Sequence, residues 1–179
     1  MTDENPPAGI DRTRPSIARV YDYWLGGKDN FESDREMGWR MAEVNPALPR
    51  LVRHNREFIC AAVARAAAAG IGQFLDLGSG LPAHPAVHEA VREVIPDARV
   101  CYVDIDPVAV LHGEVLLASG AGLAAVRADL THPETVLADP LVRRQARGVV
   151  VPEPRVRAGL LYPAGQFLVL VVPRRHDQP

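Results

Sequence analysis

The stretch Phe74-Leu-Asp-Leu-Gly-Ser-Gly-Leu-Pro82 decides the fold of this chain. Its beginning, Gln73 to Leu77, is a short apolar run bounded by glycines, which is typical of a buried strand. Gly78 and Gly80 follow directly, and glycines at that point let the backbone turn sharply and approach another group closely. The next segment, Pro85 to about Ile95, has apolar residues at helical spacing. The stretch therefore predicts a strand, a glycine-lined turn and a helix.

The same alternation continues along the chain. It predicts a strand at Arg99–Val103, a helix from Pro107 to about Leu117, a strand at Leu123–Arg127 and a short helix from Pro133 to about Leu137. Alternating strands and helices indicate a parallel sheet with helices on both faces, and right-handed crossovers give the strand order 3-2-1. The predicted fold class is α/β, a Rossmann-like doubly wound parallel sheet that is incomplete, with three to four strands.

Helices precede this core. Apolar residues at helical spacing after Ser16 predict a helix. We expect it to end at Gly26-Gly27, because glycine suits a helix C-cap. Further helices are predicted from Ser33 to about Val44 and from Pro49 to Ala69. We expect residues 1–15 to form a mobile arm, 16–70 an N-terminal helical segment, 71–143 the ligand-binding core, and 144–179 a divergent tail.

Composition excludes several classes of protein. The 179 residues are 47% apolar, with no apolar run of membrane-spanning length. The N-terminus has no basic stretch followed by an apolar one, so we expect no secretory signal. The formal net charge of −2 gives no global field to attract nucleic acid. The two cysteines, Cys60 and Cys101, lack metal-type spacing, so we expect a reducing, cytoplasmic setting.

Two carboxylates sharpen the prediction for the glycine turn. Asp76 lies two residues before Gly78, where a dinucleotide-binding turn usually has a small or apolar residue because the pyrophosphate is already negative. A carboxylate suits a ligand with an ammonium group and no phosphate, such as S-adenosylmethionine. Asp104 ends the second strand, 24 residues after Gly80, where it could accept hydrogen bonds from both ribose hydroxyls. Asp129, after the third strand, could accept from an adenine amino group.

These motifs carry a resemblance. Leu75-Asp-Leu-Gly-Ser-Gly80, Tyr102-Val-Asp-Ile-Asp-Pro107 and Arg127-Ala-Asp-Leu130 resemble the first three motifs of class I methyltransferases. The segment Arg19-Val-Tyr-Asp-Tyr-Trp-Leu-Gly-Gly-Lys-Asp-Asn-Phe31, with Asp34-Arg35 after it, resembles an actinobacterial family of S-adenosyl methyltransferases of unassigned substrate. Gly80-Leu-Pro82 and Val87-His-Glu89 match that family as well, and the resemblance covers roughly residues 10–143.

The resemblance implies a transferase that uses S-adenosyl-L-methionine to methylate a small-molecule or other acceptor. The resemblance implies that Asp76, Gly78, Ser79 and Gly80 hold the methionine part of the cofactor and that Asp104 holds the ribose. Asp106 and Asp129 would lie near the adenine, and a lid would be formed by Tyr23, Lys28, Asp29 and Asn30. No catalytic base is selected among Asp22, Asp34 and Glu36, because methyl transfer depends mainly on alignment of donor and acceptor.

Other interpretations stay open. Asp76 could be a turn carboxylate, Asp129 a helix N-cap and Lys28-Asp-Asn30 a solvated turn. His84 and His88 could share a helix face, but no third metal ligand is visible. The chain could instead be a fragment of a nicotinamide- or flavin-linked oxidoreductase, with Gly78, Gly80, Ala83 and Asp104 as its fingerprint, or a non-catalytic module that binds S-adenosylmethionine.

The resemblance stops after about Arg143. Residues 145–179 hold five prolines and five arginines but only two acidic residues. We interpret this tail as a truncated or frame-shifted ending; alternatively, it is an authentic C-terminus in which Gln166–Val172 takes the fourth strand position. Because later strands normally help to build the acceptor pocket, we expect marginal stability and weak or absent catalysis.

Overall fold

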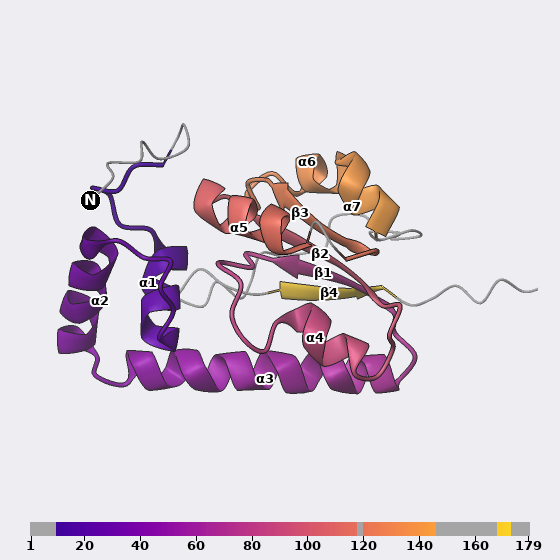
Figure 1. Cartoon of the computed structure of the whole chain (residues 1–179), viewed down its shortest axis with the longest axis horizontal. Helices are drawn as coiled ribbons and strands as arrows, with labels where there is room; N and C mark the ends of the chain where they lie inside the picture. The colour runs from indigo at the N-terminus through magenta and orange to yellow at the C-terminus, as the bar shows by residue number, and fades with distance from the viewer. Residues whose placement is uncertain (1–9, 118–119, 146–167, 173–179) are drawn as a thin grey trace, which may run out of the picture.

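The computed structural model describes residues 10–117, 120–145 and 168–172 (Figure 1). Three helices come first: α1 (Ile17–Leu25), α2 (Glu32–Val44) and α3 (Leu48–Ala68). The core follows as β1 (Gln73–Leu77), α4 (Val87–Arg92), β2 (Arg99–Asp104), α5 (Pro107–Leu117), β3 (Leu123–Arg127), α6 (Pro133–Ala138), α7 (Pro140–Gln145) and β4 (Leu168–Val172). Residues 1–9 of the predicted arm and most of the predicted tail lie outside the described residues.

The sheet has the strand order β3-β2-β1-β4. β1 pairs with β2 and β2 with β3, both in parallel, which confirms the predicted order 3-2-1 and the Rossmann-like parallel core. β4, which only the alternative interpretation of the tail placed in the fourth strand position, lies beside β1 and runs antiparallel to it, with Leu77 opposite Leu168. The prediction of a wholly parallel sheet is therefore wrong for this strand. A reversed strand does not complete a βαβ unit, and apolar periodicity fixes that a strand forms but not its direction.

Side chains alternate between the two faces of the sheet, as strand geometry requires. Phe74 and Val100 face α3 and α4, packing among Ile59, Cys60, Val63, Ala67, Val87 and Val91. Leu75, Cys101 and Val103 point to the opposite face, where they pack with Val136 of α6 and Val142 of α7. Asp76 follows Leu75 and therefore lies on the same face as Phe74, toward α3 and α4.

The long helix α3 connects the two parts of the molecule. It runs along the base of the structure, beneath α1 at one end and α4 at the other (Figure 1). α1 ends at Gly26, whose φ of 84° is the left-handed conformation expected of its C-cap. Tyr21 and Trp24 are buried against Val52 of α3. None of the helices within the described ranges is both long and apolar enough to span a membrane.

One helix is shorter than predicted, and another was not predicted. α4 is shorter than the predicted Pro85–Ile95, because it begins only at Val87 after the loop that follows Pro82. α7 was not predicted. It begins at Pro140, where the Asp139 carboxylate accepts a hydrogen bond of 2.7 Å from the backbone N–H of Leu141. An acidic residue before a proline is an N-cap signal, but a helix of six residues has too few turns to show periodicity.

Candidate functional site

The glycine turn is held against the end of β2. Gly78 and Gly80 have φ values of 71° and 63°, which a side chain would oppose. The backbone N–H groups of Gly78 and Ser79 both donate to the carbonyl of Val103, at 2.8 and 3.1 Å. These bonds join the turn after β1 to the parallel neighbour β2, so the ends of both strands form one hydrogen-bonded edge.

Asp104 is fixed at this edge by backbone donors. Its Oδ2 accepts from the N–H of Gly80 at 2.7 Å and its Oδ1 from the N–H of Asp106 at 2.8 Å. A carboxylate has about four acceptor positions, so these two bonds orient the group and leave room for about two further donors. Burial raises the pKa of Asp104, while the backbone hydrogen bonds oppose that shift.

Asp76 is the least satisfied carboxylate of the site. It is 1% exposed, and its Oδ1 has no hydrogen-bond partner among the described residues. Burial raises its pKa to about 6, and the nearby charge of Asp104 adds to the rise, whereas Arg56 opposes it. A buried carboxylate without donors is costly to keep charged, so this group is built to receive a donor that the described residues do not supply.

A cavity of about 220 Å³ lies beneath the turn. It brings together Asp76, Ser79 and Gly80 from the predicted set. The other lining residues are Arg56, Leu81, Pro82, Ala83, His84, Ala86, His88, Glu89, Tyr102, Ala109 and Gly113. The volume is below the roughly 300–1,000 Å³ of complete small-molecule sites, so the cavity suits one end of a ligand whose remainder lies outside it.

Arg56 was missed by the sequence analysis. It is 9% exposed on the sheet-facing side of α3, where its guanidinium donates to the carbonyls of Pro85 and Ala83. A signal was present: Arg56 lies four residues after Val52 and four before Cys60, on the apolar stripe of the helix. An arginine in such a stripe is rarely buried without a partner.

Tyr102 and His88, which also line the cavity, are hydrogen-bonded to each other. The Tyr102 hydroxyl accepts from the backbone N–H of His88 at 2.9 Å and lies 2.8 Å from the Nδ1 of the same residue. Burial lowers the pKa of His88, which favours the neutral form of its ring. His84 instead contacts Glu89 at 3.0 Å. Within the described ranges, no three His, Cys, Asp or Glu side chains are grouped to hold a metal ion.

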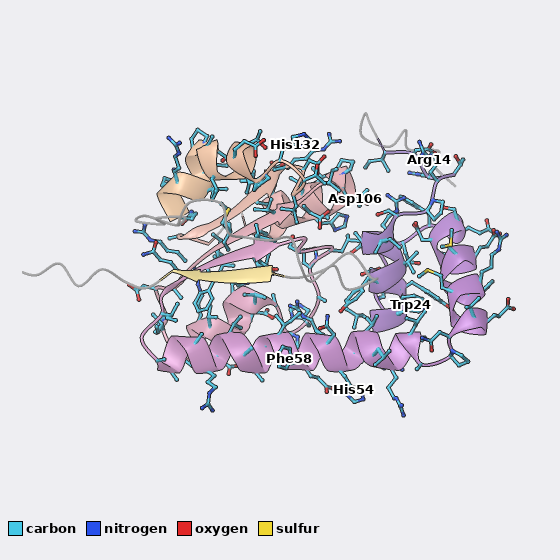
Figure 2. The ribbon with its side chains drawn as sticks, turned by 180° about the vertical axis from the view of Figure 1, so that it is seen from behind. Arg14, Trp24, His54, Phe58, Asp106 and His132 are labelled. Atoms are coloured by element: carbon cyan, nitrogen blue, oxygen red, sulfur yellow. The ribbon has the colours of Figure 1, made fainter. Side chains whose placement is uncertain are left out.

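Asp106 is not among the residues that line the cavity. Its carboxylate accepts from the Ser16 hydroxyl, from Arg19 Nη1 at 3.4 Å and from the N–H of Val108 at 2.8 Å. Figure 2 shows Asp106 on the side of the core that faces α1. The structure therefore gives this side chain a role in joining α1 to α5, and its predicted place near an adenine stays a prediction.

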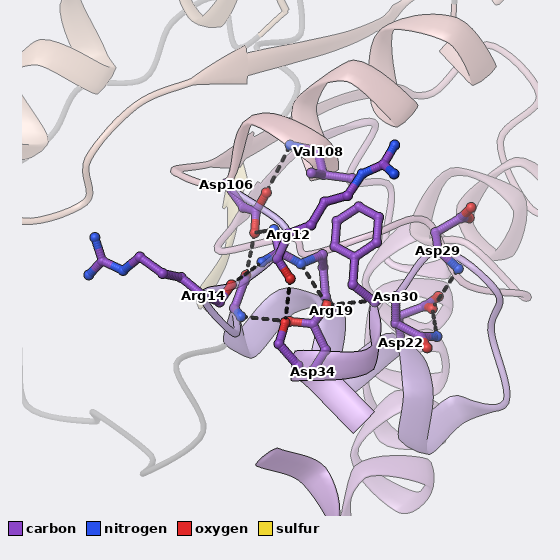
Figure 3. Close-up of polar contacts among 12 residues, drawn as sticks. Arg12, Arg14, Arg19, Asp22, Asp29, Asn30, Asp34, Asp106 and Val108 are labelled. Atoms are coloured by element: carbon purple, nitrogen blue, oxygen red, sulfur yellow. Dashed lines mark hydrogen bonds and ion pairs between the residues drawn. The ribbon is translucent and has the colours of Figure 1, made fainter. Parts of the chain in front are cut away.

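The N-terminal motif from Arg19 to Asp34 forms a second buried network (Figure 3). Asp34 is fully buried and accepts three hydrogen bonds of 2.8 Å, from Arg19 Nε and from the backbone N–H groups of Ser16 and Phe31. Arg19 also donates to the Arg14 carbonyl at 2.7 Å and lies over the Phe31 ring at 5.2 Å. These contacts hold α1 against the start of α2.

The predicted lid residues contact mainly their own loop and the neighbouring helix α2. The buried Asp22 carboxylate accepts from the N–H of Asp29 and the side chain of Asn30, at 3.0 and 2.8 Å. Tyr23 accepts from Trp39 Nε1 at 2.6 Å and so faces α2, while Lys28 is exposed. The Asp29 carboxylate lies 3.5 Å from Nδ1 of His112 in α5, and this contact links the loop to the core.

Asp129 and the candidate bases lie elsewhere. Asp129 is half-buried and closes a turn by accepting from the backbone N–H of Thr131 at 2.9 Å, ahead of α6, whose N-cap is His132. Asp22 accepts two hydrogen bonds and Asp34 three, and Glu36 forms an exposed pair with Arg40. None of these carboxylates lines the cavity.

The comparisons with known proteins agree with this geometry. A sequence profile of the S-adenosyl methyltransferase family matches residues 3–147. The chain belongs to the S-adenosyl methyltransferase family. The resemblance inferred from the motifs is thereby confirmed, and S-adenosylmethionine is the cofactor that defines the family. A search of curated proteins found no significant match.

Two crystal structures share the family fold. One is of a "putative methyltransferase" from Thermobifida fusca YX, with 48% identity and a TM-score of 0.76 over 80% of this chain and 54% of that one. The other is of a DUF574 family protein from Streptomyces avermitilis MA-4680, with 43% identity and a TM-score of 0.71 over 75% of this chain and 52% of that one. The chain spans about half the length of these two proteins.

Proposed function

We propose that this chain binds S-adenosylmethionine across the carboxyl edge of β1 and β2 and presents its methyl group to an acceptor. The single observation that carries the proposal is the orphaned Oδ1 of Asp76, buried in the wall of the cavity beneath the glycine turn. A cationic ammonium satisfies that oxygen, whereas the pyrophosphate of a nicotinamide or flavin dinucleotide would be repelled by it. This favours the methyltransferase assignment over the oxidoreductase alternative.

The residues of the edge divide the ligand between them. Asp76, with the backbone of Gly78, Ser79 and Gly80, holds the methionine end in the cavity, and Asp104 accepts from the ribose hydroxyls. The two backbone donors already on Asp104 support this role, because they fix the carboxylate before a ligand arrives. The sulfonium supplies the leaving group, and the chain contributes by aligning the donor with the acceptor.

The remaining predicted residues enter the proposal less directly. A role in cofactor binding stays a prediction for five residues, because none of them lines the cavity. They are Asp106, Asp129, Tyr23, Lys28 and Asn30, and the contacts of Asp106, Asp129 and Tyr23 are with other parts of the chain. We retain the division into a helical segment at 16–70 and a binding core at 71–143. Two free, buried cysteines support a reducing, cytoplasmic setting. The near-neutral charge favours a small-molecule acceptor over nucleic acid.

Thermal unfolding in the presence of S-adenosylhomocysteine tests the proposal. A ligand that binds only the folded state adds about 2.7 kcal/mol at a hundredfold excess over its dissociation constant. We expect this stabilisation in the wild type and its loss in Asp104→Ala, since the ribose hydroxyls then have no acceptor. Glu134→Ala is the matched control: it also removes one negative charge, but from an exposed position in α6.

The result separates the candidate functions. A wild type that NAD stabilises and S-adenosylhomocysteine does not would refute the proposal in favour of the oxidoreductase. Stabilisation by S-adenosylhomocysteine without methyl transfer to any of a broad set of acceptors would assign the chain as a binding module. Stabilisation of Asp104→Ala equal to that of the wild type would place the ribose elsewhere.

A further inference from the structure

Arg56 presents part of its guanidinium to the cavity. Its Nε and Nη2 donate to the carbonyls of Pro85 and Ala83, at 2.9 Å from Nε to Pro85 and 3.3 Å from Nη2 to Ala83. No acceptor for Nη1 exists among the described residues, although the side chain lines the cavity and is 9% exposed. A guanidinium carries five N–H donors, so the two on Nη1 are available to a bound molecule.

Asp76 and Arg56 form an unmatched pair across the same cavity. No ion pair joins them, yet both line its wall and the charge of Arg56 lowers the pKa of Asp76. Burial raises the pKa of Asp76 by more than the charge of Arg56 lowers it. The Arg56 charge is therefore close enough to influence Asp76 but does not compensate for the burial of its carboxylate. One cavity therefore presents an acceptor without a donor and a donor without an acceptor.

We propose that Arg56 is the residue that recognises the carboxylate of the bound ligand, so that Arg56 and Asp76 together select an α-amino acid group. Such a group carries an ammonium and a carboxylate on one carbon, which matches the two unmatched charges. The cavity of about 220 Å³ suits this end of the ligand. The inference rests on the proposed function and adds to it the group that the cavity selects.

The neighbouring polar side chains do not offer a second site for a carboxylate. Burial lowers the pKa of His88, whose Nδ1 lies beside the Tyr102 hydroxyl, and Glu89 would repel an anion. Arg56 is the only lysine or arginine among the residues that line the cavity. A purely structural Arg56 would tie α3 to the 83–85 loop and have no preference among ligands.

The test compares ligands that differ by one group. Titration calorimetry gives dissociation constants for S-adenosylmethionine and for decarboxylated S-adenosylmethionine, which lacks only the carboxylate. Charge-assisted bonds to one guanidinium predict about a 10- to 100-fold preference of the wild type for the carboxylated ligand. In Arg56→Met we expect this preference to fall to within about twofold of unity, by the same reasoning.

Arg92→Met is the matched control. Arg92 also donates from a side chain to two backbone carbonyls, those of Ala98 and Ala121, but it does not line the cavity. Its variant is expected to keep the wild-type preference even if both affinities change. Arg56→Lys keeps a cation but loses the planar fork, so it should retain an intermediate preference.

Each outcome decides something. Arg56→Met that weakens both ligands equally assigns Arg56 to loop structure alone and overturns the inference. If Arg56→Met does not fold, a wild type that binds both ligands equally, or Arg56→Lys with the full wild-type preference, overturns it as well. A wild type that binds neither ligand contradicts the proposed function instead, so the two failures are distinguishable.

Discussion

Two buried carboxylates, Asp34 and Asp76, show how differently the two halves of this molecule use charge. Asp34 is fully buried in the N-terminal helical segment and accepts three hydrogen bonds, one of them from Arg19. Asp76 is 1% exposed in the core, and one of its oxygens has no partner among the described residues. Both lie in motifs that carry the family resemblance, yet the first is satisfied by its own chain and the second is not.

The comparison separates structure from binding. A buried charge that the chain satisfies stabilises the arrangement of its donors, whereas one left unsatisfied lowers stability unless a ligand completes it. The helical segment thus acts chiefly as a support for the core, through the Arg19 link between Asp34 and Asp106. In the cavity at Asp76, a buried oxygen without a hydrogen-bond partner in the described chain can accept a hydrogen bond from another molecule.

The largest expected effect is in the satisfied half. Arg19→Met removes the cation shared by Asp34 and Asp106, both nearly inaccessible to solvent. Breaking a buried pair costs about 3–5 kcal/mol, because the remaining charges stay buried. We expect the melting temperature, followed by circular dichroism, to fall by about 10 °C.

Arg40→Met is the control for that experiment. Arg40 pairs with Glu36 at 3.7 Å on the exposed face of α2, with 74% of its own side chain accessible. Removing it should shift the melting temperature by no more than about 2 °C, because exposed pairs contribute little. Equal shifts in the two variants would show that the buried network does not hold the helical segment.

Removing the unsatisfied charge should have the opposite sign. Burial raises the pKa of Asp76 from 3.8 to about 6, so the folded state binds a proton more tightly than the unfolded state does. Two pKa units correspond to about 3 kcal/mol of lost stability at pH 8. Asp76→Asn removes the charge but buries an amide, so we expect a net gain of about 1–3 kcal/mol.

Urea unfolding as a function of pH checks this sign. The contribution of Asp76 to stability is fully present below pH 3.8 and is lost as pH rises through about 6. The difference between Asp76→Asn and the wild type should therefore grow from pH 4 to pH 7. A variant less stable than the wild type at pH 8 would mean that the carboxylate is satisfied after all.

Ligand affinity should depend on the same group. Binding an ammonium requires the charged form of Asp76, so affinity for S-adenosylhomocysteine should weaken about tenfold for each pH unit below about 6 and stay constant above it. Burial also raises the pKa of Asp104, which would steepen the loss in the same direction. Titration calorimetry between pH 5 and 8 measures this, and a flat profile would contradict the role of Asp76.

Much of the core could be predicted from the sequence, because its signals are local. The β1 run, the positive-φ glycines after it and Asp104 at the end of β2 all follow from strand and turn chemistry. Arg56 and Asp106 were different, since their partners lie 29 and about 90 residues away in sequence. The direction of β4 likewise depends on how the chain returns to the sheet, which no local pattern encodes.

The smallest expected effect concerns Tyr23, which the motif resemblance placed in a lid. Its hydroxyl accepts a hydrogen bond from Trp39 of α2 rather than lining the cavity. Tyr23→Phe should therefore cost roughly 0.5–1 kcal/mol of stability, the usual worth of one exposed hydrogen bond, and change affinity for S-adenosylhomocysteine less than twofold. A tenfold loss of affinity at unchanged melting temperature would support the predicted lid role of Tyr23. It would mean that the helical segment moves toward the cavity when ligand binds.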